Sequence, residues 1–301
     1  MSALSVTSIK SIAPFLLPSS PVACCSPLPE IAALREVKII GPCCSSLISC
    51  KSMADSTSSS TSLPRFECDE NGGTTGAVSP KFAEIIIVRH GETEWNVVHR
   101  IQGQLDVDLN DVGRQQAVAV AKRLSREPKI SAVYSSDLKR AYETAEVIAK
   151  HCGVPEVIKE PGFRERHVGD IQGVVFSDIA KVNPIAYKAF VSNQDDQEIP
   201  GGGESFNQLY DRCTSALQRI AQKHQGERVV VVSHGGTIRA LHRRASGKKR
   251  AAQKVLNTSV TTLHVSNKDK WSIIMWGDTS HLDLTGTGFL HSGFGGDANS
   301  A

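Results

Sequence analysis

Short aliphatic runs alternate with segments of helical periodicity from residue 83 to residue 277. The runs "AEIIIV" and "RVVVVS" have the length and apolar character of strands buried on both faces. Strands that alternate with helices indicate an α/β domain with a largely parallel sheet. The predicted strands span residues 83–88, 131–136, 156–161, 228–233, 259–266 and 271–277.

Polar and turn residues mark the ends of the predicted helices. Asn110 is the expected N-cap of a helix that runs to about Arg126, and Asp137 is expected to cap the next helix, which Gly153 ends. Ser205 opens a further helix. Two more helices are predicted, one over residues 176–192 and one from "HGG" to near 247, whereas residues 162–173 and 200–205 are expected to be irregular.

The composition changes at about residue 80. Residues 1–80 are rich in Ser, Pro and Thr and hold six of the eight cysteines, so we expect a disordered leader there. Residues 81–283 form the predicted folded domain, and residues 284–301 a flexible Gly-rich tail. The few cysteines of the domain are typical of a reduced intracellular protein.

The leader does not decide in which cellular compartment the protein is found. Its many serines and few acidic residues resemble a transit peptide, which would direct the protein to the plastid. The alternatives are an untargeted disordered tail and a cytoplasmic protein that starts at Met53.

Charge and hydropathy narrow the classes of partner. A net charge of +3 over 301 residues argues against a nucleic-acid partner. No stretch approaches the roughly 20 apolar residues that cross a bilayer, so no membrane partner is expected. The histidines have no metal-ligand spacing, and we expect neither a metal nor a cofactor. A small molecule remains as the expected partner, and the oligomeric state, a homodimer included, stays open.

Two predicted strands end in the same way, as "IIIVRHG" and "VVVVSHGG". Each delivers a histidine, His90 or His234, to the carboxyl edge of the sheet, where ligands bind in such folds. An imidazole with a pKa of about 6.5 is a ready nucleophile for phosphoryl transfer. Arg89 beside it should lower that pKa further and hold a phosphate. Gly91 would allow the backbone to approach the ligand.

Two further residues complete the candidate catalytic set. Arg140, in the first turn of a helix that follows a strand, would be a second guanidinium for the phosphate, and its alternative is an ordinary surface arginine. Glu165, in "FRERHVG", would donate a proton to the leaving oxygen, and its alternative is an ion pair with Arg164 or Arg166. The full predicted substrate-binding set is Arg89, Gly91, Glu92, Thr93, Asn96, Gln102, Gly103, Arg140, His234 and Gly235, of which Asn96, Gln102 and Gly103 are expected to be neutral donors.

Six motifs in order carry a family resemblance: "VRHGETEWN", "QGQLDVDLNDVGRQQA", "SSDLKRAYETA", "RERHVGDIQG", "PGGGES" and "VVVVSHGGTIRA". Over residues 83–282 the chain resembles the phosphoglycerate mutase-like branch of the histidine phosphatase superfamily, and its leader and length are similar to those of a plant member. The resemblance implies a three-layer α/β/α sandwich around a mostly parallel sheet, and no metal. It also implies a phosphohistidine on His90, a phosphate pocket of Arg89, Arg140 and His234, and Glu165 as the proton donor.

The same resemblance favours hydrolysis over mutase chemistry. Val168 stands where mutases of the family carry a tyrosine, and Phe176 lies near the position of their lysine. The segment Gly173–Pro200 is also short beside theirs. We therefore expect a phosphatase for a small phosphorylated metabolite. One alternative is a cofactor-dependent phosphoglycerate mutase, an isomerase of carbohydrate metabolism, and the other is an inactive protein that binds phosphorylated ligands. The physiological substrate is left open.

Overall fold

A computed structural model of the chain describes residues 78–248 and 254–283. The predicted tail and the predicted leader, apart from residues 78–80, lie outside the described residues, and both stay predictions. None of the described helices is long and apolar enough to cross a membrane.

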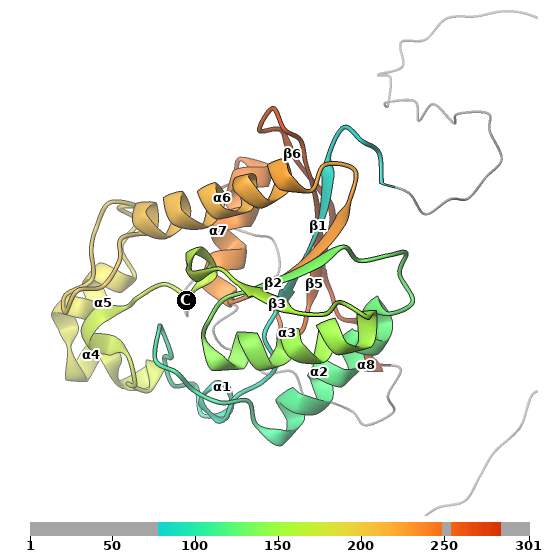
Figure 1. The fold of residues 1–301 in the computed structure, drawn as a ribbon. Coiled ribbons are helices and arrows are strands. Elements are labelled where there is room, and N and C mark those ends of the chain that lie inside the picture. The colour runs from blue at the N-terminus through green and yellow to red at the C-terminus, as the bar shows by residue number, and fades with distance from the viewer. Residues whose placement is uncertain (1–77, 249–253, 284–301) are drawn as a thin grey trace, which may run out of the picture. The chain divides into compact units, whose positions relative to one another are not determined.

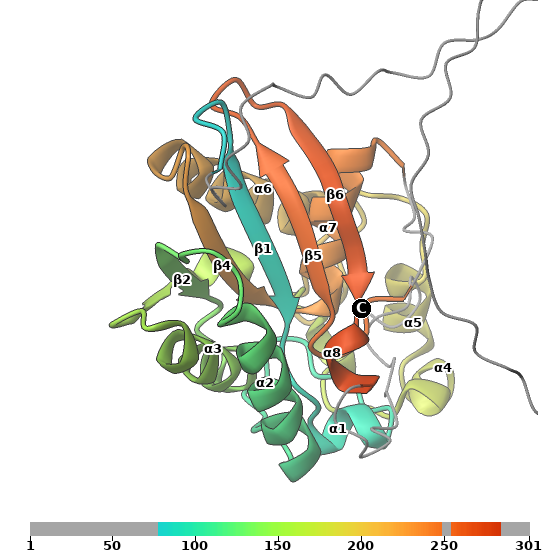
Figure 2. The same cartoon turned by 90° about the vertical axis from the view of Figure 1, so that its right-hand side faces the viewer.

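The strands of the described residues form one mixed sheet in the order β3-β2-β4-β1-β5-β6. Figure 1 shows this sheet close to edge-on, and Figure 2 shows β2, β4, β1, β5 and β6 side by side. Strands β3, β2, β4 and β1 are parallel, whereas β5 runs antiparallel to both β1 and β6. The predicted mostly parallel sheet is therefore confirmed. The bounds are β1 (Ala83–Arg89), β2 (Ala132–Ser135), β3 (Val157–Lys159), β4 (Arg228–Ser233), β5 (Val260–Val265) and β6 (Trp271–Asp278).

Helices cover both faces of the sheet, which makes three layers (Figure 2). On β1, Ile86 and Val88 pack into one apolar cluster with residues of α2 (Asp111–Leu124) and α3 (Lys139–Cys152). Ile85 and Ile87 point the other way, into a cluster with residues of α6 (Phe206–Lys223) and α7 (Gly235–Ser246). Burial on both faces explains why the central strands have continuous apolar runs.

Two predicted helix caps are confirmed. Asn110 Oδ1 accepts a hydrogen bond from the backbone N–H of Gly113 at 2.7 Å. Ser205 and Gln208 form a reciprocal capping box at the start of α6. The α2 helix ends at Leu124, two residues before the predicted end.

The predicted cap at Asp137 is wrong. The N-cap of α3 is Leu138, which contributes no side-chain hydrogen bond. Asp137 instead accepts two hydrogen bonds from Arg164, and Asp106 accepts from the backbone N–H of Lys139 at 2.7 Å. The carboxylate of Asp106, from another loop, thus accepts a hydrogen bond from the first turn of α3.

The single helix predicted over residues 176–192 is also wrong. Three short pieces replace it: η3 (Phe176–Asp178), α4 (Ile179–Val182) and α5 (Pro184–Phe190). Pro184 disfavours the α conformation at Asn183, which has φ −143° and ψ 80°, and has no N–H to donate, so a new helix starts at the proline. Four short elements were not predicted: α1 (Glu94–Val97), α8 (Ser280–Asp283), η1 (Pro161–Phe163) and η2 (Gly169–Ile171).

Candidate active site

The histidines that follow β1 and β4 lie side by side at the carboxyl edge of the sheet. Arg89 is paired with Ser233 in the parallel register of the two strands, and the backbone N–H of His90 donates to Ser233 O at 3.0 Å. The ring centroids of His90 and His234 are 5.1 Å apart. The expectation that both strands deliver a histidine to one place is confirmed.

One backbone contact sets the tautomer of His90. Its Nδ1 lies 2.6 Å from the carbonyl oxygen of Gly91, which can only accept, so Nδ1 carries the proton. Nε2 is then left with a free lone pair. The nitrogen available to attack an electrophile is therefore Nε2.

The surroundings of His90 keep its imidazole uncharged. Burial lowers its pKa well below the ordinary value, and the positive charges of Arg140 and Arg89 lower it further. The hydrogen bond to Gly91 opposes this shift without cancelling it. At neutral pH the ring is a neutral nucleophile, as expected, and burial adds to the effect predicted from the neighbouring cations.

Both arginines are buried, at 1% exposure each, so the alternative of a surface arginine at position 140 is wrong. Arg140 donates from Nη2 to Gly103 O and from Nη1 to Leu105 O, both at 2.8 Å, and Arg89 donates to Val255 O at 2.7 Å. Burial lowers the pKa of Arg140 to about 10, so its guanidinium stays charged at pH 7. Carbonyl oxygens orient these cations without neutralising them.

His234 is the N-cap residue of α7 and is fully buried. Its Nε2 lies 2.8 Å from the hydroxyl of Ser136, whereas its Nδ1 has no hydrogen-bond partner among the described residues. Burial and the nearby charge of Arg140 lower its pKa well below the ordinary value. A neutral ring that accepts from Ser136 at Nε2 would carry its proton on Nδ1, ready for an anion.

Glu165 lies on an irregular segment beside the first turn of α7. Its Oε2 accepts from the backbone N–H of Gly236 at 3.0 Å, and its Oε1 accepts from that of Arg166 at 2.8 Å. It is close enough to Arg140 for its charge to raise the pKa of that guanidinium. The alternative of an ion pair between Glu165 and Arg164 or Arg166 is wrong. The side chain of Arg164 donates to Asp137, and that of Arg166 donates to Glu204 O.

Several predicted ligands are engaged in holding the loop after β1. Thr93 and Asn96 form the capping box of α1, and the carboxylate of Glu92 accepts from Asn110 at 3.0 Å. A Cβ on Gly91 would lie 2.4 Å from Gly113 O, so the close approach of α2 already requires a glycine here, and the approach of a ligand to this backbone stays a prediction.

Three predicted ligands remain. Gly103, with φ +51°, offers its carbonyl oxygen to Arg140, and its part as a donor to a ligand stays a prediction. Gln102 is buried, and its Oε1 has no partner among the described residues. Gly235 opens α7 next to His234. The parts of Asn96, Gln102 and Gly235 in binding a phosphate stay predictions.

Sequence reasoning missed four residues that hold the catalytic side chains. Ser136 contacts His234, and Asn257 Nδ2 donates to His90 O at 3.0 Å. Thr144 Oγ1 accepts from the backbone N–H of Gly91 at 3.1 Å, and Gln104 Nε2 donates to Glu165 O at 3.0 Å. Ser136, Gln104 and Thr144 stood inside recognised motifs, which was the available signal, whereas Asn257 had none. No group of three His, Cys, Asp or Glu side chains that could hold a metal occurs in residues 78–248 and 254–283.

Comparisons with known proteins identify one family. Residues 85–279 match the model of the histidine phosphatase superfamily (branch 1). The chain is 61% identical over 219 residues to phosphoglycerate mutase-like protein 4 of Arabidopsis thaliana, covering 73% of this chain and 94% of that protein. It is 54% identical over 221 residues to the metal-independent phosphoserine phosphatase of the same plant, covering 73% and 91%.

A solved structure shows the same fold. The phosphoserine phosphatase of Entamoeba histolytica, in complex with 3-phosphoglyceric acid, superposes with a TM-score of 0.59 and is 30% identical, covering 66% of this chain and 99% of that chain.

Proposed function

The chain belongs to the histidine phosphatase superfamily (branch 1), and from this premise we propose that it hydrolyses small phosphate monoesters, phosphoserine among them, through a phosphohistidine on His90. The observation that carries the proposal is the surroundings of one atom. Nε2 of His90 keeps a free lone pair, and burial together with the positive charges of Arg140 and Arg89 keeps its ring neutral.

In the first step, Nε2 of His90 attacks phosphorus and the bond to the ester oxygen breaks. Arg89, Arg140 and the Nδ1–H of His234 are placed to bind the non-bridging oxygens, whose charge they stabilise in the transition state. Glu165 donates a proton to the departing oxygen, which leaves as an alcohol.

In the second step, water attacks the phosphohistidine. Glu165 accepts a proton from that water as the N–P bond breaks, so inorganic phosphate leaves and His90 and Glu165 return to their starting states. This chemistry needs no group beyond the side chains of the chain.

Two features support hydrolysis over a mutase cycle. Val168 is fully buried in an apolar cluster with Ile171 and Ile179, and Phe176 packs against that cluster. The positions where mutases of the family carry a tyrosine and a lysine thus offer this site no polar clamp for a substrate. Phosphoserine is the first substrate to test, because two relatives bear that activity in their names.

The experiment mixes the protein rapidly with p-nitrophenyl phosphate and quantifies an acid-labile phosphoenzyme. We expect one phosphoryl group per active site in the wild type and none in His90→Asn. Phosphate release from phosphoserine is measured beside conversion of 3- to 2-phosphoglycerate. Efficient conversion without phosphate release would establish the mutase instead, and ligand binding without any phosphoenzyme would establish a binding protein.

A further inference from the structure

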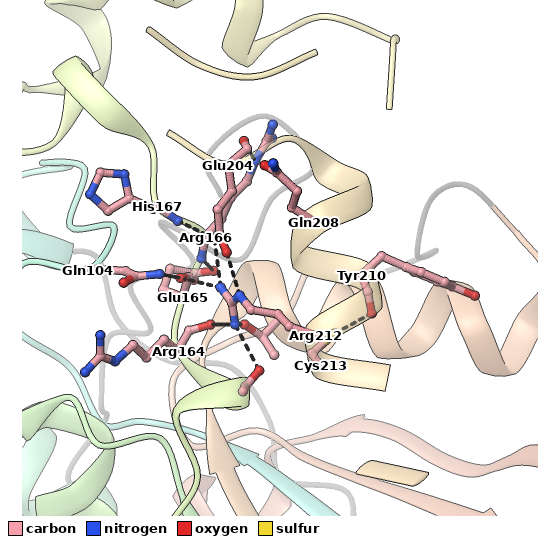
Figure 3. A network of polar contacts seen from close by, with 12 residues as sticks. Gln104, Arg164, Glu165, Arg166, His167, Glu204, Gln208, Tyr210, Arg212 and Cys213 are labelled. Atoms are coloured by element: carbon pink, nitrogen blue, oxygen red, sulfur yellow. Dashed lines mark hydrogen bonds and ion pairs between the residues drawn. The ribbon is translucent and has the colours of Figure 1, made fainter. Parts of the chain in front are cut away.

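The segment 162–167, called here the acid loop, carries Glu165, and after η1 ends at Phe163 it has no helix or strand to fix it. Figure 3 shows that one side chain from a distant helix enters it: Arg212, in the second turn of α6. The guanidinium contacts the backbone carbonyl oxygens of Gly162 at 2.9 Å, Arg164 at 2.8 Å and Glu165 at 2.8 Å.

The second partner of Arg212 is the carboxylate of Glu204. Nε and Nη2 of Arg212 donate to Oε1 and Oε2 of Glu204 at 2.6 and 2.9 Å. Oε2 of Glu204 also accepts from the backbone N–H of His167 at 2.8 Å. The five N–H donors of Arg212 thus match five hydrogen bonds, and both ends of the acid loop are tied to one ion pair.

The pair stays charged in its largely buried setting. Burial alone would raise the pKa of Glu204, but the hydrogen bond and charge of Arg212 bring that pKa below its ordinary value. Side-chain exposure is 22% for Arg212 and 19% for Glu204, so solvent screens the contact only in part.

The contact to Glu165 is the one that bears on catalysis. The backbone carbonyl of Glu165 is bonded by Arg212, while its carboxylate bonds the N–H of Gly236 beside His234. Displacing this backbone would move the carboxyl group relative to the ester oxygen, and displacements of about 1 Å can cost about 100-fold in rate.

Other contacts keep the acid loop folded without Arg212. Thr237 Oγ1 donates to Arg164 O at 2.8 Å, and Ser233 Oγ donates to Phe163 O at 2.9 Å. Removal of the Arg212 guanidinium should therefore displace the acid loop without unfolding the domain.

We propose that Arg212, oriented by Glu204, is a positioning residue that sets the reach of the Glu165 carboxyl group to the leaving oxygen. This inference rests on the proposed function, in which Glu165 protonates that oxygen. It predicts a defect that depends on the leaving group. An alkoxide such as that of serine needs the proton, whereas p-nitrophenolate leaves readily without it.

The test compares kcat/KM for phosphoserine and for p-nitrophenyl phosphate in Arg212→Lys. Lysine keeps the charge but cannot reproduce the planar fork. We expect kcat/KM for phosphoserine to fall about 100-fold, near the lower end of what a general acid contributes, and that for p-nitrophenyl phosphate to fall less than about threefold. The ratio of the two values does not depend on the fraction of folded protein.

Two further variants complete the experiment. Glu204→Gln removes the charge that orients Arg212 and should change the ratio in the same direction. Arg219→Lys alters an exposed arginine of the same helix, which bonds Glu160 at 3.3 Å, and should leave both values unchanged.

The outcomes separate the two proposals. If the wild type forms no phosphohistidine, the proposed function fails. If the wild type is active and Arg212→Lys lowers both substrates equally, or neither, the positioning proposal is overturned while the proposed function stands.

Discussion

In each of the two histidines of the site, one neighbouring group contacts one ring nitrogen and leaves the other nitrogen available to a substrate. Gly91 O fixes the proton of His90 on Nδ1 and leaves Nε2 as a nucleophile. The hydroxyl of Ser136 contacts Nε2 of His234, which leaves Nδ1 without a partner among the described residues. If the hydroxyl of Ser136 donates to Nε2, the proton of His234 lies on Nδ1, where it can be donated to a phosphoryl oxygen.

Ser136→Ala should lower kcat/KM about tenfold, because the loss of one buried hydrogen bond costs about 1.4 kcal/mol in the transition state. Steady-state kinetics with p-nitrophenyl phosphate measures the effect, and ¹⁵N NMR of the imidazoles reports the tautomer. Without the hydroxyl, His234 should show a mixture of tautomers.

The matched control is the preceding serine. Ser135 is equally buried, but its hydroxyl donates to the backbone oxygen of Ser136 at 2.7 Å and does not contact the imidazole. Ser135→Ala should therefore retain the wild-type tautomer of His234. A single unchanged tautomer in Ser136→Ala would show that the serine does not set it.

At this scale, the sequence predicts residues that stand at strand and helix ends within recognisable motifs. Arg89, His90, Arg140 and His234 do so, and they meet as expected. Asn257 could not be found in this way. It reaches His90 from a loop 167 positions away in the chain, and no local period or motif marks such a contact.

Among the elements, α2 approaches the loop after β1 so closely that no side chain fits between them. A Cβ on Gly113 would lie 2.0 Å from Glu92 O. The first turn of this helix thereby fixes the backbone that follows His90.

Gly113→Ala should destabilise the protein by about 1–3 kcal/mol, the usual cost of overpacking. In an exposed helix the same substitution would stabilise by about 1 kcal/mol through helix propensity, so the clash decides the sign. Urea unfolding measures the change. Catalytic activity should fall with stability, because the displaced backbone carries His90.

Gln115→Ala provides the control, since this residue of α2 is exposed and its replacement tests helix propensity alone. It should leave stability within about 0.5 kcal/mol and activity unchanged. A stable, fully active Gly113→Ala would mean that the loop moves freely away from α2.

Elements governed by local chemistry were predictable, and those governed by distant partners were not. Asn110 and Ser205 cap their own helices through backbone groups three residues on, so the sequence identifies them. Asp137 fails as a cap because Arg164, from another segment, takes its carboxylate. The helix break before Pro184 could have been predicted from the proline itself. The prediction of one continuous helix overlooked this local signal.

At the scale of the whole molecule, the two buried histidines of the site lower the free energy of unfolding as the pH falls. The folded pKa values of His90 and His234 lie well below 6.5, mainly through burial, whereas both titrate near 6.5 in the unfolded chain. Below pH 6.5 the unfolded state therefore binds more protons than the folded state. The free energy of unfolding must fall as the pH falls, until the folded pKa values are reached.

Each histidine should contribute a slope of up to about 1.4 kcal/mol per pH unit between pH 6.5 and 5. His90→Asn removes one of the two groups, so its slope in that window should be smaller than that of the wild type by about this amount. Urea unfolding at several pH values, in buffers without phosphate, measures both slopes. Carboxylates that titrate at lower pH contribute equally to the two proteins and cancel in the difference. An undiminished slope in His90→Asn would mean that His90 is protonated in the folded state, and a protonated imidazole cannot attack phosphorus.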